Sequence, residues 1–276
     1  KYDQALAIKS DSSLWQWGGS KYIYERALNH PNLVDSSQKW QKVSTGSGFY
    51  AAITDSGALW TWGDNSYGQI GNGTTTNLWT PTQLGLDQDW VDISCGPDFM
   101  VALKSNGSLW AWGRNRNTSP TQIETDTTWI AISSGKERSL GIKADLSLWL
   151  INSGGTQVID NGQWKTSSKG NYTDYGIKND GSLWTWNNTN RTPVQVGSNS
   201  DWKTLDCSHL NHALFVKNNG TLWAVGTNNF GQLGDNSITN KTTPVQIGTA
   251  NNWEKVIAGS MYSLALQTNR SLWGWG

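Results

Sequence analysis

Histidine and cysteine, the side chains most often used for metal binding and nucleophilic catalysis, are scarce here: the sequence has three His and two Cys. His209 and His212 stand close together, but no third ligand accompanies them at a spacing typical of a metal site. Cys95 and Cys207 hold nearly equivalent positions in two repeat units and are expected to be separate buried thiols. The sequence therefore predicts no catalytic residue, no metal site and no cofactor.

Most acidic residues fall in predicted turns, where an Asp side chain normally accepts a hydrogen bond from its own backbone. Asp11, Asp55 and Asp180 are examples. Asp64 and Asp235 lie in polar loops that could offer oxygen ligands to a cation, although neither loop has the pattern of a calcium site. The two neighbouring histidines accompany one extra residue in their repeat unit, which a local bulge explains better than a metal site does.

Composition excludes several classes of protein. The 276 residues carry 21 basic and 21 acidic side chains, so the chain lacks the positive surplus that nucleic-acid binding requires. No apolar run approaches the roughly 18 residues of a membrane-spanning helix. The 19 tryptophans are far too many for a disordered chain. We therefore expect a folded protein with no nucleic-acid partner and no membrane span.

Tryptophan marks an internal repeat. A Leu-Trp pair recurs seven times, and a second Trp stands two residues later in five copies. A third series opens each unit, usually 20 residues before the Leu-Trp tryptophan. The Leu-Trp tryptophans, which we predict to be structural core residues, are Trp15, Trp60, Trp110, Trp149, Trp184, Trp223 and Trp273. The opening tryptophans are Trp40, Trp90, Trp129, Trp164, Trp202 and Trp253, and the second tryptophans are Trp17, Trp62, Trp112, Trp186 and Trp275.

Each unit is predicted to form four short strands. In the second unit these begin near Trp40, Tyr50, Leu59 and Pro81, with a tight Gly-containing turn before Leu59. Alternation places Leu59 on one face of its strand and its two tryptophans on the other, so both faces are apolar. Such sheets bury both faces by stacking side by side, and closing the stack into a ring removes its exposed ends. The predicted fold is all-β, a seven-bladed β-propeller of mostly four-stranded antiparallel blades; a solenoid of sheets is the alternative.

A single propeller domain is predicted over residues 1–276. The first unit begins in its second strand and the last stops before its fourth. We therefore expect either a segment of a longer chain or a ring closed by strands from both ends. The units cover about residues 1–39, 40–89, 90–128, 129–163, 164–201, 202–252 and 253–276.

Residues 55–73, from Asp-Ser-Gly-Ala-Leu-Trp to Gly-Asn-Gly, resemble the repeat of the regulator of chromosome condensation family, and residues 227–235 resemble it again. The resemblance implies a seven-bladed propeller. Members of this family act as exchange factors for a small GTPase, ubiquitin-ligase modules, a plant UV-B photoreceptor and bacterial β-lactamase inhibitors. The chain lacks the photoreceptor's Gly-Trp-Arg-His-Thr motif and a long inserted hairpin. Where the family often has His, this sequence has Phe49, Phe99, Arg138, Thr173, His212 and Tyr262.

The resulting functional hypothesis is a non-enzymatic propeller that binds a protein partner or an assembly neighbour. Low Lys content and richness in Asn, Thr, Ser and Gly favour an extracellular setting, on a bacterial cell or phage virion surface. Three alternatives stay open: a soluble inhibitor or regulator that caps a protein partner, a glycan-binding propeller, and a guanine nucleotide exchange factor for a small GTPase.

The contact surface is predicted from loop lengths. The loop after the third strand is long in the first, second and sixth units and short in the third to fifth. Functional residues concentrate in loops, and exposed aromatic side chains are common anchors of interfaces. The predicted interface residues are Trp79, Tyr22, Tyr24, Tyr67, Phe230 and Ile238, and Trp79 is the one tryptophan outside the repeat registers.

Overall fold

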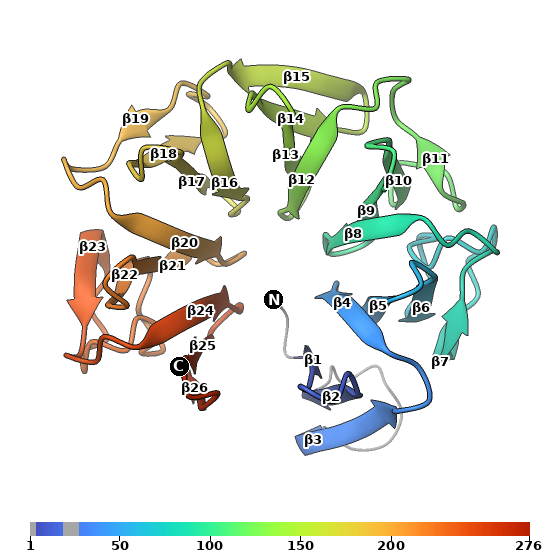
Figure 1. Cartoon of the computed structure of the whole chain (residues 1–276), viewed down its shortest axis with the longest axis horizontal. Helices are drawn as coiled ribbons and strands as arrows, with labels where there is room; N and C mark the ends of the chain where they lie inside the picture. Colours follow the sequence, from blue (N-terminus) through green and yellow to red (C-terminus); the bar gives the residue numbers. More distant parts are fainter. Residues whose placement is uncertain (1–3, 19–27) are drawn as a thin grey trace. The chain divides into compact units, whose positions relative to one another are not determined.

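The computed structural model describes residues 4–18 and 28–276 of the chain. Within these ranges the backbone forms β-strands, turns and no helix. The strands make seven antiparallel sheets, five with four strands and two with three (Figure 1). This confirms the predicted fold class, a seven-bladed β-propeller with mostly four-stranded blades. None of the described residues forms a helix that could cross a bilayer.

The chain divides into two compact units, and the first comprises residues 1–139 and 151–156. Sheet 1 contains β1 (Gln4–Ile8), β2 (Leu14–Gly18) and β3 (Leu28–Asp35). Sheet 2 contains β4 (Trp40–Thr45), β5 (Phe49–Thr54), β6 (Leu59–Gly63) and β7 (Leu78–Gln83). Sheet 3 contains β8 (Trp90–Cys95), β9 (Phe99–Lys104), β10 (Leu109–Gly113) and β11 (Thr121–Gln122).

The second unit comprises residues 140–150 and 157–276. The division passes through sheet 4, which contains β12 (Trp129–Ser134), β13 (Ser139–Lys143), β14 (Leu148–Asn152) and β15 (Gly155–Asp160). Sheet 5 contains β16 (Trp164–Ser168), β17 (Thr173–Lys178), β18 (Leu183–Asn187) and β19 (Val194–Gln195). Sheet 6 contains β20 (Trp202–Cys207), β21 (His212–Lys217), β22 (Leu222–Gly226) and β23 (Lys241–Ile247), and sheet 7 contains β24 (Trp253–Ala258), β25 (Ser263–Gln267) and β26 (Leu272–Trp275). A single domain over the whole chain stays a prediction.

The turn before the Leu-Trp strand uses one recurring set of hydrogen bonds in five of the sheets. Asp180 Oδ1 accepts from the Ser182 backbone N at 2.9 Å, and Ser182 Oγ accepts from the Trp184 indole Nε1 at 2.7 Å. The Ser182 hydroxyl, which donates to Asp180 Oδ1 at 2.6 Å, and the Ser182 backbone N together hold the pKa of Asp180 below its ordinary value. The predicted turn role of Asp is thus confirmed here, whereas near Asp55 the Thr54 hydroxyl accepts the backbone bond instead. The same arrangement recurs at Asp11, Ser13 and Trp15, at Asn106, Ser108 and Trp110, at Asp145, Ser147 and Trp149, and at Asn219, Thr221 and Trp223.

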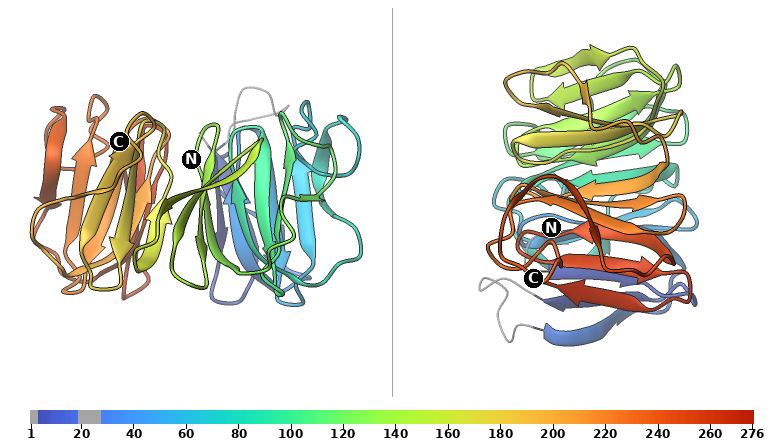
Figure 2. Two further views of the ribbon diagram at one scale, coloured as in Figure 1. Left: turned by 90° about the horizontal axis from the view of Figure 1, so that it is seen from above. Right: turned by 90° about the vertical axis from the view of Figure 1, so that its left-hand side faces the viewer.

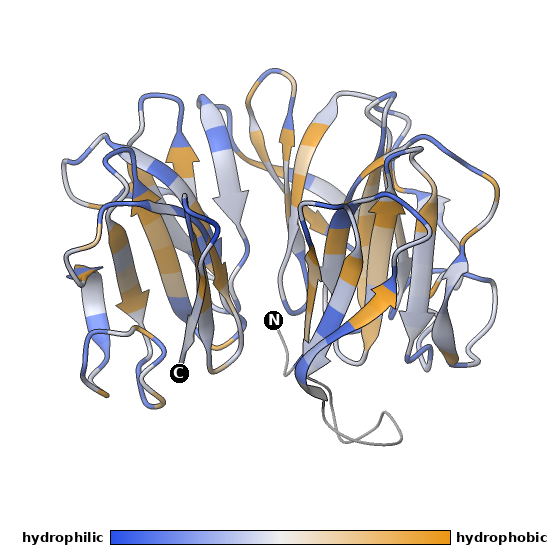
Figure 3. Ribbon diagram, turned by 60° about the horizontal axis from the view of Figure 1, so that its bottom comes forward, coloured by the Kyte–Doolittle hydropathy of each residue, from blue (hydrophilic) through white to orange (hydrophobic). Residues whose placement is uncertain are grey.

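The core of each unit lies between neighbouring sheets, where the hydrophobic residues coloured orange in Figure 3 concentrate in the strands. In the first unit, Ile53 and Leu59 of sheet 2 pack with Trp90 and Ile93 of sheet 3. In the second unit, Leu214 and Leu222 of sheet 6 belong to a cluster that includes residues of sheet 7. Apolar strands with both faces covered explain why the Leu-Trp repeat has no polar face. All six opening tryptophans are buried, as predicted.

The Leu-Trp tryptophans are less buried than the opening ones, and in several sheets a lysine at the end of the second strand lies over the ring. Lys217 Nζ is 4.7 Å from the ring centres of both Trp202 and Trp223. Lys104 is placed in the same way, 4.8 Å from Trp90 and 5.0 Å from Trp110. The ammonium group of each lysine is attracted to two tryptophan rings, and this attraction stabilises the sheet. The sequence pattern predicts an entirely apolar face at this place.

Sheets within a unit are linked along their first strands. In the first unit Cys95 N donates to Ser44 Oγ at 2.9 Å, and in the second unit Cys207 N donates to Ser168 Oγ at 3.0 Å. Each bond joins one sheet to the next in the chain. Cys95 and Cys207 are both buried, and neither forms a disulfide.

The side chain of Trp273 is 54% exposed in the described part of the chain, where β26 is the last strand of sheet 7, and its place in the core stays a prediction. One expectation is wrong in detail. The extra residue beside His209 and His212 lies in the β20–β21 turn rather than in a bulged strand. Asn211 adopts a left-handed φ of 65° in that turn, and Ser208 Oγ accepts from His212 N at 3.1 Å.

Candidate binding surface

Two long loops share one architecture, although they belong to different units. The β6–β7 loop spans residues 64–77 and the β22–β23 loop spans residues 227–240. Each is organised around a fully buried asparagine, Asn65 or Asn228, whose side chain bonds to backbone groups across the loop. A buried amide with several partners fixes a loop that has few apolar residues of its own.

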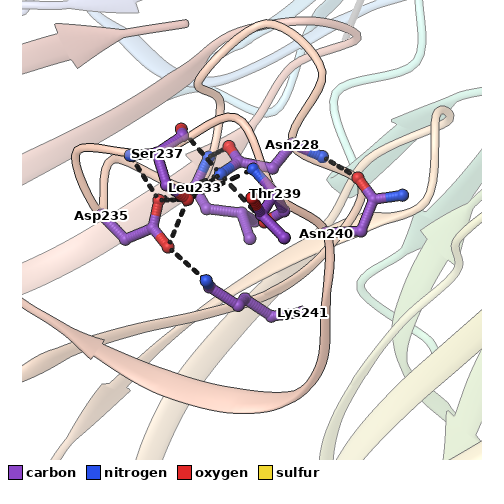
Figure 4. A network of polar contacts seen from close by, with 7 residues as sticks. All are labelled: Asn228, Leu233, Asp235, Ser237, Thr239, Asn240 and Lys241. Atoms are coloured by element: carbon purple, nitrogen blue, oxygen red, sulfur yellow. Dashed lines mark hydrogen bonds and ion pairs between the residues drawn. The ribbon is translucent and has the colours of Figure 1, made fainter.

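Figure 4 shows this network around Asn228. Asn228 Nδ2 donates to Ser237 O at 2.9 Å and to Asp235 Oδ1 at 3.0 Å, while Asn228 Oδ1 accepts from Leu233 N at 2.9 Å. Asn228 N donates to Asn240 Oδ1 at 2.8 Å. The asparagine therefore connects the start, middle and end of its loop.

The Asn65 loop repeats these bonds in the first unit. Asn65 Nδ2 donates to Thr74 O and to Thr76 O, both at 3.0 Å, and Asn65 Oδ1 accepts from Ile70 N at 2.9 Å. Asn72 replaces Asp235 of the other loop and accepts from Asn65 Nδ2 at 3.2 Å. The shared geometry shows that the two loops are built as rigid platforms.

Carboxylates in these loops bind protein groups. Asp64 accepts from Gln69 Nε2 at 2.9 Å, and Asp235 pairs with Lys241 Nζ at 3.1 Å. Burial acts to raise the pKa of Asp235, but hydrogen bonds from Ser237, Lys241 and Asn228 outweigh it and leave this pKa below its ordinary value. No group of three metal-ligating side chains occurs among residues 4–18 and 28–276.

The loops present Tyr67 and Phe230 at equivalent positions, and the rings are 41% and 54% exposed. Gln69 Oε1 accepts from Tyr67 N at 2.8 Å, and Gln232 Oε1 accepts from Phe230 N at 2.9 Å. In the first unit the guanidinium of Arg114 lies 3.9 Å from the Tyr67 ring centre. Each aromatic ring is thus exposed on a backbone that is held in place, which suits an interface anchor.

The other predicted interface residues are placed differently. Trp79, expected in a loop, lies in β7, the outer strand of sheet 2, and is 45% exposed. The strand begins earlier than expected because Leu78 pairs with Gly63 across a register shift. Ile238 is 71% exposed in the β22–β23 loop. Tyr22 and Tyr24 lie outside the described residues.

Sequence reasoning missed a set of exposed apolar residues in the second of the two compact units, residues 140–150 and 157–276. They occupy turns between first and second strands, where repeat spacing carries no exposure signal. His212 pairs with Gly226 in sheet 6, so the β20–β21 turn lies at the same end of that sheet as the loop that carries Phe230. The residues are Tyr172, Leu210 and Met261. Tyr172 belongs to the fifth repeat unit, one of the repeat units with a short loop after the third strand, where no interface residue was predicted.

The loop network gives a stability prediction. Replacing Asn228 with alanine removes its side-chain bonds to five groups and leaves the buried Leu233 amide unpaired, so we expect the free energy of unfolding to fall by about 2 kcal/mol. Urea unfolding of purified protein measures this change. Asn229→Ala, at the exposed neighbouring position, is the matched control and should unfold like the original protein. Equal stability of both variants would contradict the structural role of Asn228.

Comparison with known proteins identifies the repeat. Models of the regulator of chromosome condensation (RCC1) repeat match residues 56–103 and 219–266, and a second RCC1 repeat model matches residues 40–69 and 90–118. The human E3 ubiquitin-protein ligase HERC2 is 32% identical over 88 residues, covering 29% of this chain and 2% of HERC2. The dog X-linked retinitis pigmentosa GTPase regulator is 43% identical over 61 residues, covering 22% of this chain and 6% of that protein.

The fold is also found among solved structures. Prp20p from Saccharomyces cerevisiae superposes with a TM-score of 0.81 at 15% identity, covering 96% of this chain and 80% of Prp20p. At 15% sequence identity, the similarity to Prp20p shows that the two proteins share a fold. The chain spans only a small part of the curated relatives it matches, 2% of HERC2 and 6% of the dog protein.

Proposed function

Because the chain is an RCC1-repeat protein, we propose that it acts as a non-enzymatic propeller that binds a protein partner through its long loops. The observation that carries this proposal is the pair of exposed rings, Tyr67 and Phe230, each held on a loop that a buried asparagine makes rigid. Rigid exposed aromatic side chains lose little conformational freedom on binding and are enriched in interface hot spots.

The relatives support a role in protein recognition. Prp20p has been described for its binding to Gsp1p and histones, and the dog relative is named as a GTPase regulator. This chain has the same fold and presents apolar side chains from the equivalent loops of two different sheets. A regulator or an assembly component that binds a protein surface is consistent with both observations.

The proposed location is extracellular, on a bacterial cell or phage virion surface. Its support is compositional: charged residues are 15% of the chain, and Asn, Thr, Ser and Gly dominate the loops. Immunogold labelling of intact cells or particles with an antibody against the chain tests this location. Labelling only after permeabilisation would contradict it.

Nucleotide exchange on a small GTPase is a second candidate function, favoured by similarity to the GTPase regulator. In that case the protein would accelerate release of a fluorescent guanine nucleotide from a purified small GTPase. Absence of acceleration, together with stable binding of another protein, would favour the non-enzymatic role.

Affinity capture with matched variants tests the proposed function. The double variant Tyr67→Ala/Phe230→Ala should lose a captured partner, because hot-spot rings cost about 2 kcal/mol or more each when truncated. Leu86→Ser is the control, since Leu86 is exposed in the β7–β8 loop, at the other end of sheet 2. Titration calorimetry with the purified partner then gives the change in Kd. Unchanged Kd in the double variant would place the interface elsewhere.

Trp79 gives an independent prediction. Its side chain is 45% exposed on an outer strand, so Trp79→Ala should lower the melting temperature by at most about 2–4 °C, corresponding to 1 kcal/mol in a protein of this size. We expect a weakened interaction with the partner in the same calorimetric titration. A markedly lower melting temperature with intact binding would instead make Trp79 a packing residue.

A further inference from the structure

Three polar side chains converge at one end of sheet 5. Lys169 lies in the β16–β17 turn, Asp174 in β17 and Asn188 directly after β18. Lys169 Nζ is 2.7 Å from Asp174 Oδ1 and donates to Asn188 Oδ1 at 3.0 Å. The amine therefore stands between a carboxylate, which can accept its proton, and a carboxamide, which contains a carbonyl carbon that an amine can attack.

None of these three residues recurs at the equivalent position of sheets 2, 3 or 6. Strand pairing, together with the backbone bond made by the residue after each third strand, identifies the equivalent positions. Those sheets form without the trio, so the needs of the scaffold do not account for it. The equivalent residues are Thr45, Tyr50 and Asp64 in sheet 2, Cys95, Met100 and Arg114 in sheet 3, and Cys207, Ala213 and Thr227 in sheet 6.

Burial favours proton transfer within the trio. The side chains of Lys169 and Asp174 are each 2% exposed, and burial raises the pKa of Asp174 above its ordinary value despite the neighbouring ammonium group. A carboxylate with a raised pKa accepts a proton more readily, and loss of that proton gives lysine its nucleophilic, neutral form.

The carboxamide of Asn188 is oriented for reaction. Its Oδ1 accepts from Lys169, while its Nδ2 points away and donates to Asn171 O at 2.7 Å. Asn188 is itself exposed, so a group released from its side chain can pass directly into solvent.

We propose that Lys169 and Asn188 form an intramolecular isopeptide bond, with Asp174 transferring the protons. The Lys169 ammonium gives a proton to the Asp174 carboxylate, and the neutral amine attacks Cγ of Asn188. The bond from Cγ to Nδ2 then breaks, and Nδ2 leaves as ammonia after Asp174 has passed a proton from the amine to it. Three ammonium and two amide hydrogens become one on the new amide, three on ammonia and one on Asp174, so atoms and charge balance.

The cross-link would join the β16–β17 turn to the end of β18 and close a loop over residues 169–188. A covalent closure of this kind stabilises a fold by restricting the unfolded chain, as a disulfide does. The ion pair between Lys169 and Asp174 is then the state of the chain before the reaction. The reaction needs no co-reactant and involves none of the residues of the long-loop surface.

Intact mass spectrometry of the purified protein, after overnight incubation at neutral pH, tests the proposal. We expect a mass lower than that of the sequence by one ammonia molecule. Trypsin does not cleave after an acylated lysine, so residues 166–178 should be recovered joined to residues 179–191. Fragmentation of this joined pair should identify Lys169 and Asn188 as the linked residues.

Variants of the trio separate cross-linking from other losses of ammonia. Asn188→Ala removes the acyl group at an exposed position, and Lys169→Arg keeps the charge but removes the nucleophile, so both should have the full mass of their sequences. Asp174→Asn should likewise remain uncross-linked, because an amide cannot accept the lysine proton. Asn171→Ala is the matched control: Asn171 contacts Asn188 through its backbone oxygen, so this variant should still lose ammonia.

Full mass of the original protein after incubation would overturn the proposal, as would conversion of Asn188 to aspartate without a cross-link. A loss of ammonia that persists in Lys169→Arg would also overturn it, since an asparagine that cyclises on its own backbone releases ammonia without lysine. Cross-linking in Asp174→Asn would contradict the role of Asp174. Partner capture through Tyr67 and Phe230 is measured separately, so failure here leaves the proposed function standing.

Discussion

Replacing Asp174 with alanine is expected to destabilise the protein by about 3–5 kcal/mol, because it leaves a buried ammonium group without its counterion. The side chains of Lys169 and Asp174 are each 2% exposed, and Lys169 Nζ lies 2.7 Å from Asp174 Oδ1. Asn188 Oδ1 accepts a further bond from Lys169 Nζ at 3.0 Å, and Gly170 N donates to Asp174 Oδ1 at 3.1 Å. The charges are thus satisfied only as a set.

The same positions are uncharged in sheets 3 and 6. Lys169 follows Ser168 as Cys95 follows Ser94, and Asp174 holds the place of Met100, which pairs with Cys95. In sheet 6 the corresponding pair is Cys207 and Ala213. The blade scaffold therefore folds without this ion pair when both positions are small or apolar.

That comparison supplies the control. The double variant Lys169→Cys/Asp174→Met reproduces the pair found in sheet 3, and it should recover most of the stability that Asp174→Ala loses. Urea unfolding of the original protein, Lys169→Cys, Asp174→Met and the double variant forms a complete double-mutant cycle. A loss below 1 kcal/mol in Asp174→Ala would show that water reaches Lys169 and that the pair is not buried in solution.

Sequence periodicity predicted the scaffold because one rule recurs in every unit. Opening and Leu-Trp tryptophans fall at fixed distances, and a turn residue such as Asp180 stands at a fixed place before the strand. Local turn chemistry and burial of both sheet faces then agree on one fold. The prediction of seven mostly four-stranded sheets rested on that agreement.

Departures from the repeat were harder to interpret. The Lys169–Asp174 pair forms across a hairpin, so its partners are identified only once strand register is known. Lys217 lies over two tryptophan rings, a placement that the tryptophan spacing does not predict. Trp79 was assigned to a loop because a register shift in β7 leaves no mark in the sequence. Tyr67 and Phe230 are exposed on loops that the buried Asn65 and Asn228 organise, and the spacing of the repeat does not predict that burial.

Lowering the pH from about 6.5 to about 4 is expected to remove about 3 kcal/mol of stability through one histidine, at 1.36 kcal/mol per pKa unit. Burial lowers the pKa of His212 from 6.5 to about 4, against a smaller opposing effect of Asp206. The unfolded chain therefore binds a proton that the folded chain does not bind between these two values. Stability due to neutral His212 is complete above pH 6.5 and declines as the pH falls towards 4.

The hydrogen bonds explain why the charged form is disfavoured. Ser263 Oγ donates to Gln232 O at 2.7 Å, so the same oxygen accepts from His212 Nε2 at 3.0 Å. His212 Nδ1 is buried without a partner. Protonation would place a second N–H at Nδ1 with no acceptor, in a site from which water is excluded.

His212→Phe separates this effect from other titrations, because Phe49 and Phe99 occupy the equivalent position in sheets 2 and 3. Urea unfolding at intervals between pH 4 and 7 should show a steep loss of stability for the original protein and a nearly flat profile for the variant. Carboxylates with lowered pKa, such as Asp180 and Asp235, lose most of their stabilising effect below their ordinary pKa of 3.8, so the larger part of that loss falls outside this range. Parallel profiles for the two proteins would mean that His212 is protonated in the folded state, and that the β20–β21 turn opens to admit water.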